Sequence, residues 1–153
     1  MPRLRHIHLN EHPYMITTNT MNREPIFTDN KAADIGMDAI LFGRKQQWYY
    51  LLAFAIMPDH LHLIIIPKDK NISSCMKSIK GFTAKKINEV LGREGAIWQS
   101  GFYDYILNSE DMILTRIRYI EENPVRKGLV INPEEYKYSS SGYRGKTDFE
   151  IFF

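Results

Sequence analysis

The 153-residue sequence lacks the features that mark several large classes of protein. Its one cysteine, Cys75, rules out an intramolecular disulfide and with it a disulfide-stabilised secreted scaffold. The longest apolar run, from Leu51 to Met57, is far shorter than the roughly 20 residues that a membrane-spanning helix needs. The first 14 residues contain no apolar stretch of the signal-peptide type. We therefore expect a cytoplasmic protein with no membrane contact.

A strong charge of either sign is also missing. The chain has 20 basic and 18 acidic residues and a formal net charge of +2, so its total charge indicates no class of partner. Apolar residues make up 44% of the chain and charged residues 25%, which is ordinary for a folded globular protein. The length suits a single domain over residues 1–153 with a hydrophobic core of its own.

Positive charge is concentrated in one stretch, residues 76–93, where Glu89 is the only acid. The lysines of this stretch are Lys77, Lys80, Lys85 and Lys86. Such a stretch can follow a phosphate backbone, or it can be the solvated face of an ordinary helix. The charge pattern leaves both interpretations open.

The expected order of elements points to an α+β fold. Composition and alternation predict strands over residues 14–20, 48–57 and 60–67, and a bent or broken strand over 96–107. Helical spacing and capping residues predict helices over 29–46, 73–91 and 109–122. The order β-α-β-β-α-β is that of the ferredoxin-like fold, an antiparallel sheet with helices on one face, here followed by a C-terminal helix.

Individual residues set the expected boundaries. Pro58 and Asp59 predict a tight turn between two strands. The residue before Pro124 is pushed out of helical geometry, so the last long helix is expected to end near Glu122. One further turn would then precede Gly128, a good helix stop.

Side-chain spacing also predicts what is buried. Apolar stripes on the first two helices include Phe42, Phe82 and Val90, which we expect to face the core. Residues 133–145 are expected to form a flexible tail of loop and turn.

Two histidines begin the strand expected over residues 60–67. Because side chains alternate along a strand, His60 and His62 project from the same face. Two neutral imidazoles on one face form half of a metal site, although a hydrogen-bonded pair at a strand end explains them equally well. His6 and His8 repeat the spacing in a polar terminal segment, and we assign them no role.

Tyr119 and Asn123 are the candidate partners of these histidines on the last long helix. They lie four residues apart and so share one helical face, which also carries Met112 and Arg116. An amide oxygen is a plausible ligand for a hard divalent ion, which would place Tyr119 beside the metal. Taken singly, Tyr119 is also explained as a half-buried aromatic and Asn123 as a helix-ending Asn-Pro.

Taken together, these segments resemble the single-tyrosine HUH transposases, and most closely the REP-associated tyrosine transposases. The resemblance covers roughly residues 10–145 and rests on the ordered strings MPDHLHLI, IWQSGFYDYIL, YIEENPVRKGLV and EEYKYSSSG. A His-x-His motif alone is not specific. The ordered combination of Met-Pro-Asp-His-x-His, Trp-Gln and Tyr-Ile-x-x-Asn-Pro-Val is specific. The family is ferredoxin-like, in agreement with the expected order of elements.

The resemblance implies a reaction and a site. It implies a metal-dependent single-stranded DNA endonuclease and transposase that attacks with Tyr119 and holds the cut strand as a 5′-phosphotyrosine. His60, His62 and Asn123 would hold the metal, Mg²⁺ or Mn²⁺. The implied partner is single-stranded or hairpin DNA, and a homodimer is left open.

DNA contacts are expected from two further sets of side chains. Phosphate contacts are expected from Lys77, Lys80, Lys85, Lys86 and Arg116. Stacking on bases is expected from some of Trp98, Phe102, Tyr103 and Tyr105, with the others in the core.

Two alternatives share part of this pattern. The histidine-triad nucleotide hydrolases have a similar strand, but their nucleophilic histidine would fall on Ile64, which cannot attack phosphorus. The other alternative is a domesticated transposase that binds hairpin DNA without cutting it. Binding alone requires no such set as His60, His62, Tyr119 and Asn123, so the sequence favours cleavage.

Overall fold

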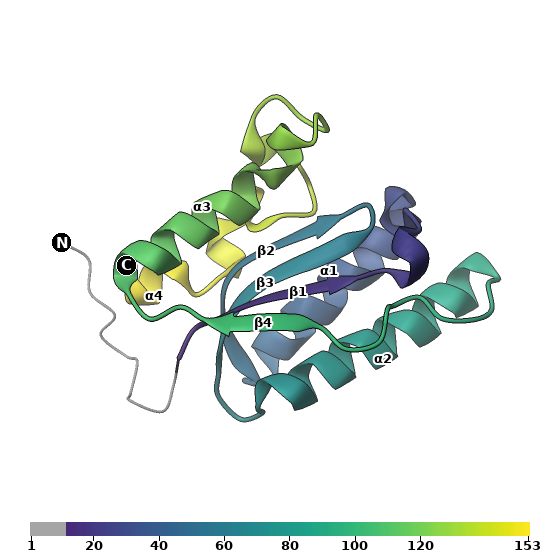
Figure 1. The fold of residues 1–153 in the computed structure, drawn as a ribbon, viewed down its shortest axis with the longest axis horizontal. Coiled ribbons are helices and arrows are strands. Elements are labelled where there is room, and N and C mark those ends of the chain that lie inside the picture. Colours follow the sequence, from purple (N-terminus) through teal and green to yellow (C-terminus); the bar gives the residue numbers. More distant parts are fainter. Residues whose placement is uncertain (1–11) are drawn as a thin grey trace.

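The computed structural model describes residues 12–153, which form one antiparallel sheet with helices on both faces (Figure 1). The strands are β1 (Tyr14–Asn19), β2 (Tyr49–Met57), β3 (His60–Pro67) and β4 (Tyr103–Ile106), in the order β2-β3-β1-β4. The helices are α1 (Asn30–Lys45), α2 (Ile72–Leu91), α3 (Glu110–Arg126) and the short α4 (Phe149–Phe152). The predicted α+β class and ferredoxin-like element order are confirmed. His6 and His8 lie outside the described residues.

Different helices cover the two faces of the sheet. On β3, Leu63 and Ile65 face a core that they share with α1 and α2. Ile64 and Ile66 face the other way, into a core shared with Ile117 and its neighbours on α3. Each fully buried side chain of this kind contributes about 1.5–3 kcal/mol to folding. The two helices of the ferredoxin-like unit, α1 and α2, therefore lie on one face of the sheet, as predicted. The tyrosine-bearing α3 lies on the opposite face.

An irregularity in β2 sets the register beside the histidines. The pairing with β3 shifts between Leu51 and Ala53, and Leu52 is the extra residue. A shift of one residue turns every later side chain to the other face. As a result, Ala55 pairs with His62 on the face covered by α3. The small Ala55 side chain leaves space beside the His62 ring.

The fourth strand is shorter than predicted. Only Tyr103–Ile106 forms β4. The earlier part of the expected segment forms an isolated bridge between Trp98 and Thr20, the residue that follows β1. Gly101, at φ +75°, separates the two parts in a backbone conformation that other residues rarely adopt. The bend was foreseen, but the length of the strand was not.

Helix α3 does not end before Pro124, and this prediction was wrong. The helix continues through Pro124 to Arg126, and Gly128 then stops it at φ +73°. Pro124 lacks an N–H, but its ring is buried and its carbonyl accepts the N–H of Leu129 at 2.9 Å. Packing and turn bonds offset the lost helical hydrogen bond, and they keep Asn123 inside the helix.

Three side chains expected in the core are exposed. Phe42 on α1 and Phe82 and Val90 on α2 lie at the outer margins of the helix stripes, and about half of each side chain remains accessible. Helix spacing predicts a stripe but not its width, which depends on how closely the two helices approach. Within residues 12–153, no helix is both long and apolar enough to cross a membrane.

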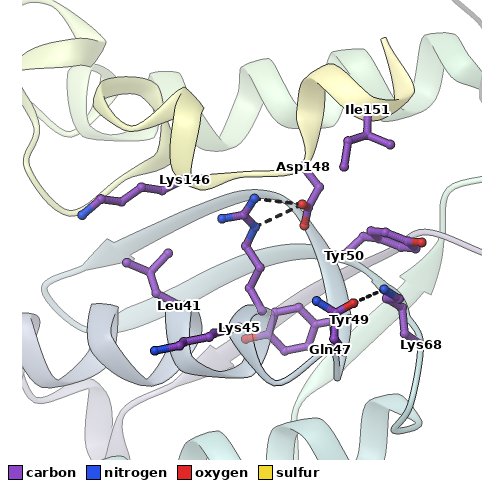
Figure 2. Close-up of a pocket in the computed structure, with 10 residues that line it drawn as sticks. Leu41, Lys45, Gln47, Tyr49, Tyr50, Lys68, Lys146, Asp148 and Ile151 are labelled. Carbon is purple, nitrogen blue, oxygen red and sulfur yellow. Dashed lines mark hydrogen bonds and ion pairs between the residues drawn. The ribbon is translucent and has the colours of Figure 1, made fainter.

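The C-terminal segment is mostly loop and turn, as predicted, but specific contacts hold it against the sheet, which the sequence did not indicate. Asp148, labelled in Figure 2, lies above the end of α1. It accepts a hydrogen bond from the backbone N–H of Leu51 at 2.8 Å and pairs with Arg44 at the end of α1 at 3.0 Å. Further along β2, Ser139 forms a bridge with Ala55. The segment thus covers the edge of β2, which would otherwise expose unpaired backbone groups.

Candidate active site

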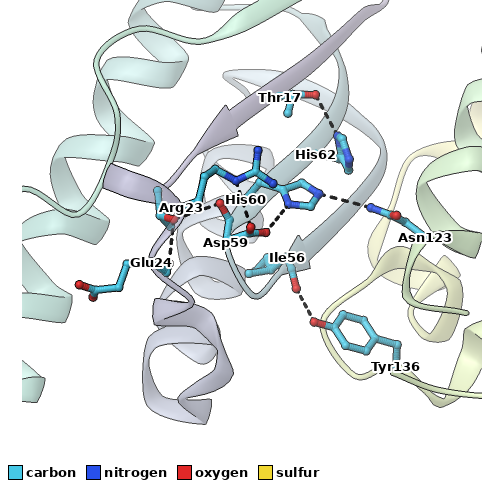
Figure 3. A network of polar contacts seen from close by, with 10 residues as sticks. Thr17, Arg23, Glu24, Ile56, Asp59, His60, His62, Asn123 and Tyr136 are labelled. Carbon is cyan, nitrogen blue, oxygen red and sulfur yellow. Dashed lines mark hydrogen bonds and ion pairs between the residues drawn. The ribbon is translucent and has the colours of Figure 1, made fainter. Parts of the chain in front are cut away.

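Both histidines lie on the sheet face that α3 covers. His60 and His62 are each only 7% exposed, and their ring centroids are 4.7 Å apart with the planes nearly perpendicular (Figure 3). The shared face is a direct consequence of their spacing along β3. The sequence prediction on this point agrees with the structure.

In each imidazole the Nδ1 atom has a hydrogen-bonding partner. His60 Nδ1 lies 2.8 Å from a carboxylate oxygen of Asp59, whose other oxygen accepts from Arg23 Nε at 3.0 Å (Figure 3). His62 Nδ1 lies 2.9 Å from the hydroxyl of Thr17 on β1. A proton held at Nδ1 leaves the Nε2 lone pair available, which is how metal-binding histidines are usually oriented.

Burial keeps both rings neutral. It lowers the pKa of His60, and the hydrogen bond and negative charge of Asp59 partly oppose that shift. It also lowers the pKa of His62, to about 3, with further contributions from His60, when that ring is protonated, and from the positive charges of Arg126 and Arg23. At neutral pH the two imidazoles therefore carry free lone pairs, the form in which histidine binds a metal.

Asn123 completes the group from α3. It is buried, and its amide Nδ2 donates to His60 Nε2 at 3.4 Å. A half-turn of the amide would present Oδ1 to the same point. Among residues 12–153 no three His, Cys, Asp or Glu side chains form a metal-binding cluster, so an amide is the third donor that the fold offers here. Two neutral nitrogens and one amide oxygen fit a divalent cation such as Mg²⁺ or Mn²⁺.

Tyr119 lies one helical turn before Asn123 and faces the same side. Its ring centroid is 6.1 Å from that of His62, and 40% of the side chain is exposed, so a substrate can reach it. The Arg126 guanidinium lies 4.2 Å from the centre of the Tyr119 ring, and the same side chain donates to the carbonyl of Tyr119. The tyrosine is thus held beside the histidines in a cationic environment.

The expected phosphate-binding residues divide between the two faces. Arg116 lies on α3 with its guanidinium 5.6 Å from the Tyr119 ring centre. The four lysines of α2 belong to the helix that packs on the opposite face from the histidines. Lys77, Lys85 and Lys86 are exposed there, and Lys80 donates to the backbone carbonyls of Gln99 and Gly101. Of the five residues expected to contact phosphates, only Arg116 is next to Tyr119, where Arg126 also lies.

Two of the aromatic residues considered for stacking are structural. Trp98 is buried, and its indole N–H donates to the hydroxyl of Thr83 at 2.8 Å. Phe102 is partly buried against the same core. Tyr103 and Tyr105, in contrast, are exposed on β4.

Two tyrosines of the C-terminal segment, which were expected to lie in a flexible tail, are held by specific contacts. The hydroxyl of Tyr136 donates to the carbonyl of Ile56 at 2.6 Å, and Tyr138 is buried in the core beside α1 (Figure 3 shows Tyr136). Both hydroxyls face backbone carbonyls, since that of Tyr138 donates to Asn30 at 3.4 Å. The segment carries these rings because they fix it to the sheet.

Sequence reasoning missed the residues that orient the histidines. Asp59 was interpreted only as a turn residue, although it directly precedes His60. Thr17 and Arg23 lie about 40 residues away in sequence and carry no local signal. The register of β1 against β3 places Thr17 opposite His62. Arg23 is identified only by the fold of the turn after β1, which brings it to Asp59.

Comparisons with known proteins agree with this arrangement. The sequence model of the family described as "Transposase IS200 like" matches residues 8–123, about three quarters of the chain. A Haemophilus influenzae protein with the provisional name REP-associated tyrosine transposase is 28% identical over 100 residues, which cover 58% of this chain and 57% of that protein. The REP-associated tyrosine transposase of Escherichia coli K12 is 26% identical over 104 residues, covering 67% and 60%. The chain thus spans less than two thirds of the length of these relatives.

Two solved structures have a similar fold. A REP-associated tyrosine transposase bound to a REP hairpin superposes with a TM-score of 0.70 at 22% identity, covering 92% of this chain and 82% of the other. A Deinococcus radiodurans protein provisionally assigned as a transposase gives a TM-score of 0.52 at 22% identity, covering 80% and 97%. The family resemblance predicted from the motifs is confirmed.

Proposed function

Because the chain belongs to the family of IS200-like transposases, we propose that it is a divalent-metal-dependent endonuclease and strand transferase for single-stranded DNA. The observation that carries the proposal is the meeting of four side chains from two distant elements. His60 and His62 on β3 face Asn123 on α3, and Tyr119 lies one turn away with an exposed side chain. We extend the proposal to hairpin DNA because a structurally similar protein was solved with a REP hairpin.

In this proposal His60, His62 and Asn123 hold the metal. When bound, a divalent cation would polarise the scissile phosphate and offset the charge that develops on it. Asp59 and Thr17 keep the Nδ1 atoms of the two imidazoles engaged, so the Nε2 atoms would be available to hold the ion. Burial of the three donors excludes water from the ligand side of the site.

Tyr119 is the proposed nucleophile. Its hydroxyl oxygen attacks phosphorus, the phenolic proton leaves, and the P–O3′ bond breaks. The products are a 5′-phosphotyrosine and a strand with a free 3′-hydroxyl, whose oxygen takes up a proton. Because the phosphodiester energy is kept in the covalent link, the reverse attack by another 3′-hydroxyl joins two strands.

Cations around Tyr119 support this role. Arg116 and Arg126 place guanidinium groups 5.6 and 4.2 Å from the ring centre, where they can hold the phosphates on either side of the attacked bond. The α2 lysines would contact DNA only if the strand also reached the other face of the sheet. We therefore assign Arg116, and not the lysines, to the neighbourhood of the reaction.

The test is the formation of a covalent protein–DNA adduct. Purified protein is incubated with end-labelled single-stranded DNA from the flanks of its gene, with Mn²⁺ or with chelator, and analysed on a denaturing gel. We expect an adduct that requires the metal and that is absent in Tyr119→Phe, which keeps the ring and removes one oxygen. Tyr143→Phe is the matched control, because Tyr143 packs against the core on the other face. An adduct of unchanged yield in Tyr119→Phe would reject the assignment.

A further inference from the structure

Two exposed tyrosines lie on the edge strand beside the candidate active site. Tyr103 and Tyr105 on β4 are 68% and 41% exposed. In the register between β1 and β4, Tyr103 lies opposite Thr17 and Tyr105 opposite Met15. Met15 belongs to the core under α3, so both tyrosines project from the face that carries the histidines.

The strand register aligns these tyrosines with the histidines. His62, Thr17 and Tyr103 are direct neighbours across β3, β1 and β4. With adjacent strands about 4.8 Å apart, the backbone of Tyr103 lies about 10 Å from that of His62. The short Thr17 side chain between them hydrogen-bonds to His62. The surface from the histidines to the edge of the sheet therefore carries one short side chain and then an exposed ring.

Arg116 connects the edge strand to the proposed nucleophile. Its guanidinium lies 5.9 Å from the ring centre of Tyr105 and 5.6 Å from that of Tyr119. The one acid of β4, Asp104, lies opposite Ile16 and so projects from the other face, where α1 and α2 pack. The strand thus offers this face two aromatic rings and no negative charge.

We propose that Tyr103, Tyr105 and Arg116 form a stacking platform that binds the unpaired nucleotides next to the phosphate attacked by Tyr119. The proposal rests on the proposed function and deepens it, because it names residues that select single-stranded DNA. An exposed tyrosine ring stacks on any base. The Arg116 guanidinium, between the rings of Tyr105 and Tyr119, can bind the phosphate that joins the stacked bases to the attacked position. In a duplex the bases are already stacked on one another, so the platform favours unpaired nucleotides.

A second copy of the chain is the competing occupant of this edge, because an edge strand exposes backbone groups that can pair with another strand. The side chains favour DNA over a copy. The two exposed rings project from the sheet face toward the site and not along the hydrogen-bonding direction of the edge. The positive charge of Arg116, which lies between the rings of Tyr105 and Tyr119, suits a phosphate.

The test combines variants of the platform with variants of the substrate. Binding of full-length protein to labelled single-stranded DNA is measured by fluorescence anisotropy, for an oligonucleotide with normal bases and for one with abasic sites beside the cleavage position. Tyr103→Ala and Tyr105→Ala should each weaken binding of the normal oligonucleotide by about 5- to 150-fold. Neither should further weaken binding of the abasic one. Tyr→Phe at each position should restore the binding that Ala loses, since the ring does the stacking.

The control is Ile131→Ala, which shortens an exposed apolar side chain, 83% accessible, outside the platform. Its binding should match that of the wild type. The proposal is overturned if the Ala variants bind as tightly as wild type, or if they weaken both oligonucleotides equally. It is also overturned if sedimentation shows that the wild type is a dimer and the Ala variants are monomers, which would make the edge a protein interface. Absence of a covalent adduct in the wild type would instead contradict the proposed function, and these binding measurements would still test the platform.

Discussion

One carboxylate orients the His60 ring. The Asp59 carboxylate accepts a hydrogen bond from His60 Nδ1 and is held in turn by Arg23, so His60 Nε2 faces Asn123. Asp59→Asn keeps the shape and removes the charge, and we expect Mn²⁺ affinity to fall about 10- to 100-fold, measured by titration calorimetry. Asp69→Asn, a change to an exposed carboxylate just after β3, should leave the affinity unchanged. Equal affinities in Asp59→Asn and wild type would show that the ring needs no such support.

The neutral state of His62 makes stability depend on pH. In the unfolded chain this histidine takes up a proton near pH 6.5, whereas in the folded chain its pKa is lowered to about 3 by burial. Between these values the unfolded state binds the extra proton, so the free energy of unfolding falls as the pH falls. One whole proton corresponds to about 1.4 kcal/mol per pH unit.

Urea unfolding at several pH values between about 7 and 4 checks this sign. The wild type should lose stability toward acid more steeply than His62→Gln, which has no imidazole at this position. Only the difference between the two slopes is attributed to His62, because other groups titrate in the same range. Identical slopes would contradict the buried neutral imidazole.

At the scale of elements, α3 is held in place by the C-terminal segment. The Glu121 carboxylate is buried two residues after Tyr119 and accepts from Ser140 Oγ and Arg144 Nη2, both at 2.6 Å. Ser140 Oγ also accepts from the backbone N–H of Phe54 in β2 at 3.1 Å. This chain of hydrogen bonds links the tyrosine helix to the sheet.

Glu121→Ala should therefore lower the free energy of unfolding by about 1–3 kcal/mol, since it leaves buried donors without an acceptor. The neighbouring Glu122→Ala is the control, because that side chain is half exposed and its nitrogen–oxygen distance to Arg126 is 3.8 Å. It should cost less than about 0.5 kcal/mol. Denaturant unfolding measures both variants, and equal losses would mean that the C-terminal segment does not anchor α3.

Local pattern predicted most elements, and tertiary contacts account for the rest. The strands β1, β2 and β3 and the three long helices appear close to where alternation and helical spacing placed them. The continuation of α3 past Pro124 depends on packing around the proline, which no local pattern reveals. The position of residues 138–148 against the sheet depends on hydrogen bonds to β2 and an ion pair with α1. Side-chain exposure at Phe82 likewise follows from how α1 and α2 approach.

At the scale of the whole molecule, the candidate site is built from residues that lie far apart in the sequence. His60 and Asn123 are 63 residues apart, and only the family motifs indicated that they meet. Spacing alone predicted that the two histidines share a face and that Tyr119 and Asn123 share another. Identifying Thr17 required the sheet register, and identifying Arg23 required the fold of the turn that follows β1. The single-domain boundary, the cytoplasmic location and a homodimer stay predictions.

The charge distribution predicts how binding responds to salt. Contacts to phosphates release counterions, so the logarithm of the affinity for single-stranded DNA should fall linearly with the logarithm of salt concentration, by about 0.7 per phosphate contact. Arg116→Ala should weaken binding and reduce this slope by about that amount. Anisotropy titrations at several salt concentrations measure both. Equal affinity for single strands and a blunt perfect duplex at every salt concentration would contradict a site built for unpaired DNA.

The central claim is that Tyr119, next to a metal held by His60, His62 and Asn123, carries the covalent link to DNA. The most direct test is tandem mass spectrometry of the protein after reaction with single-stranded DNA and Mn²⁺ and digestion of both polymers. We predict a 5′-nucleotide linked through phosphate to the peptide that contains Tyr119, and no such peptide when a chelator is present or when both histidines are changed to Ala. A linkage at another residue, such as Tyr103 or Tyr105, or an equal yield with chelator, would contradict the account.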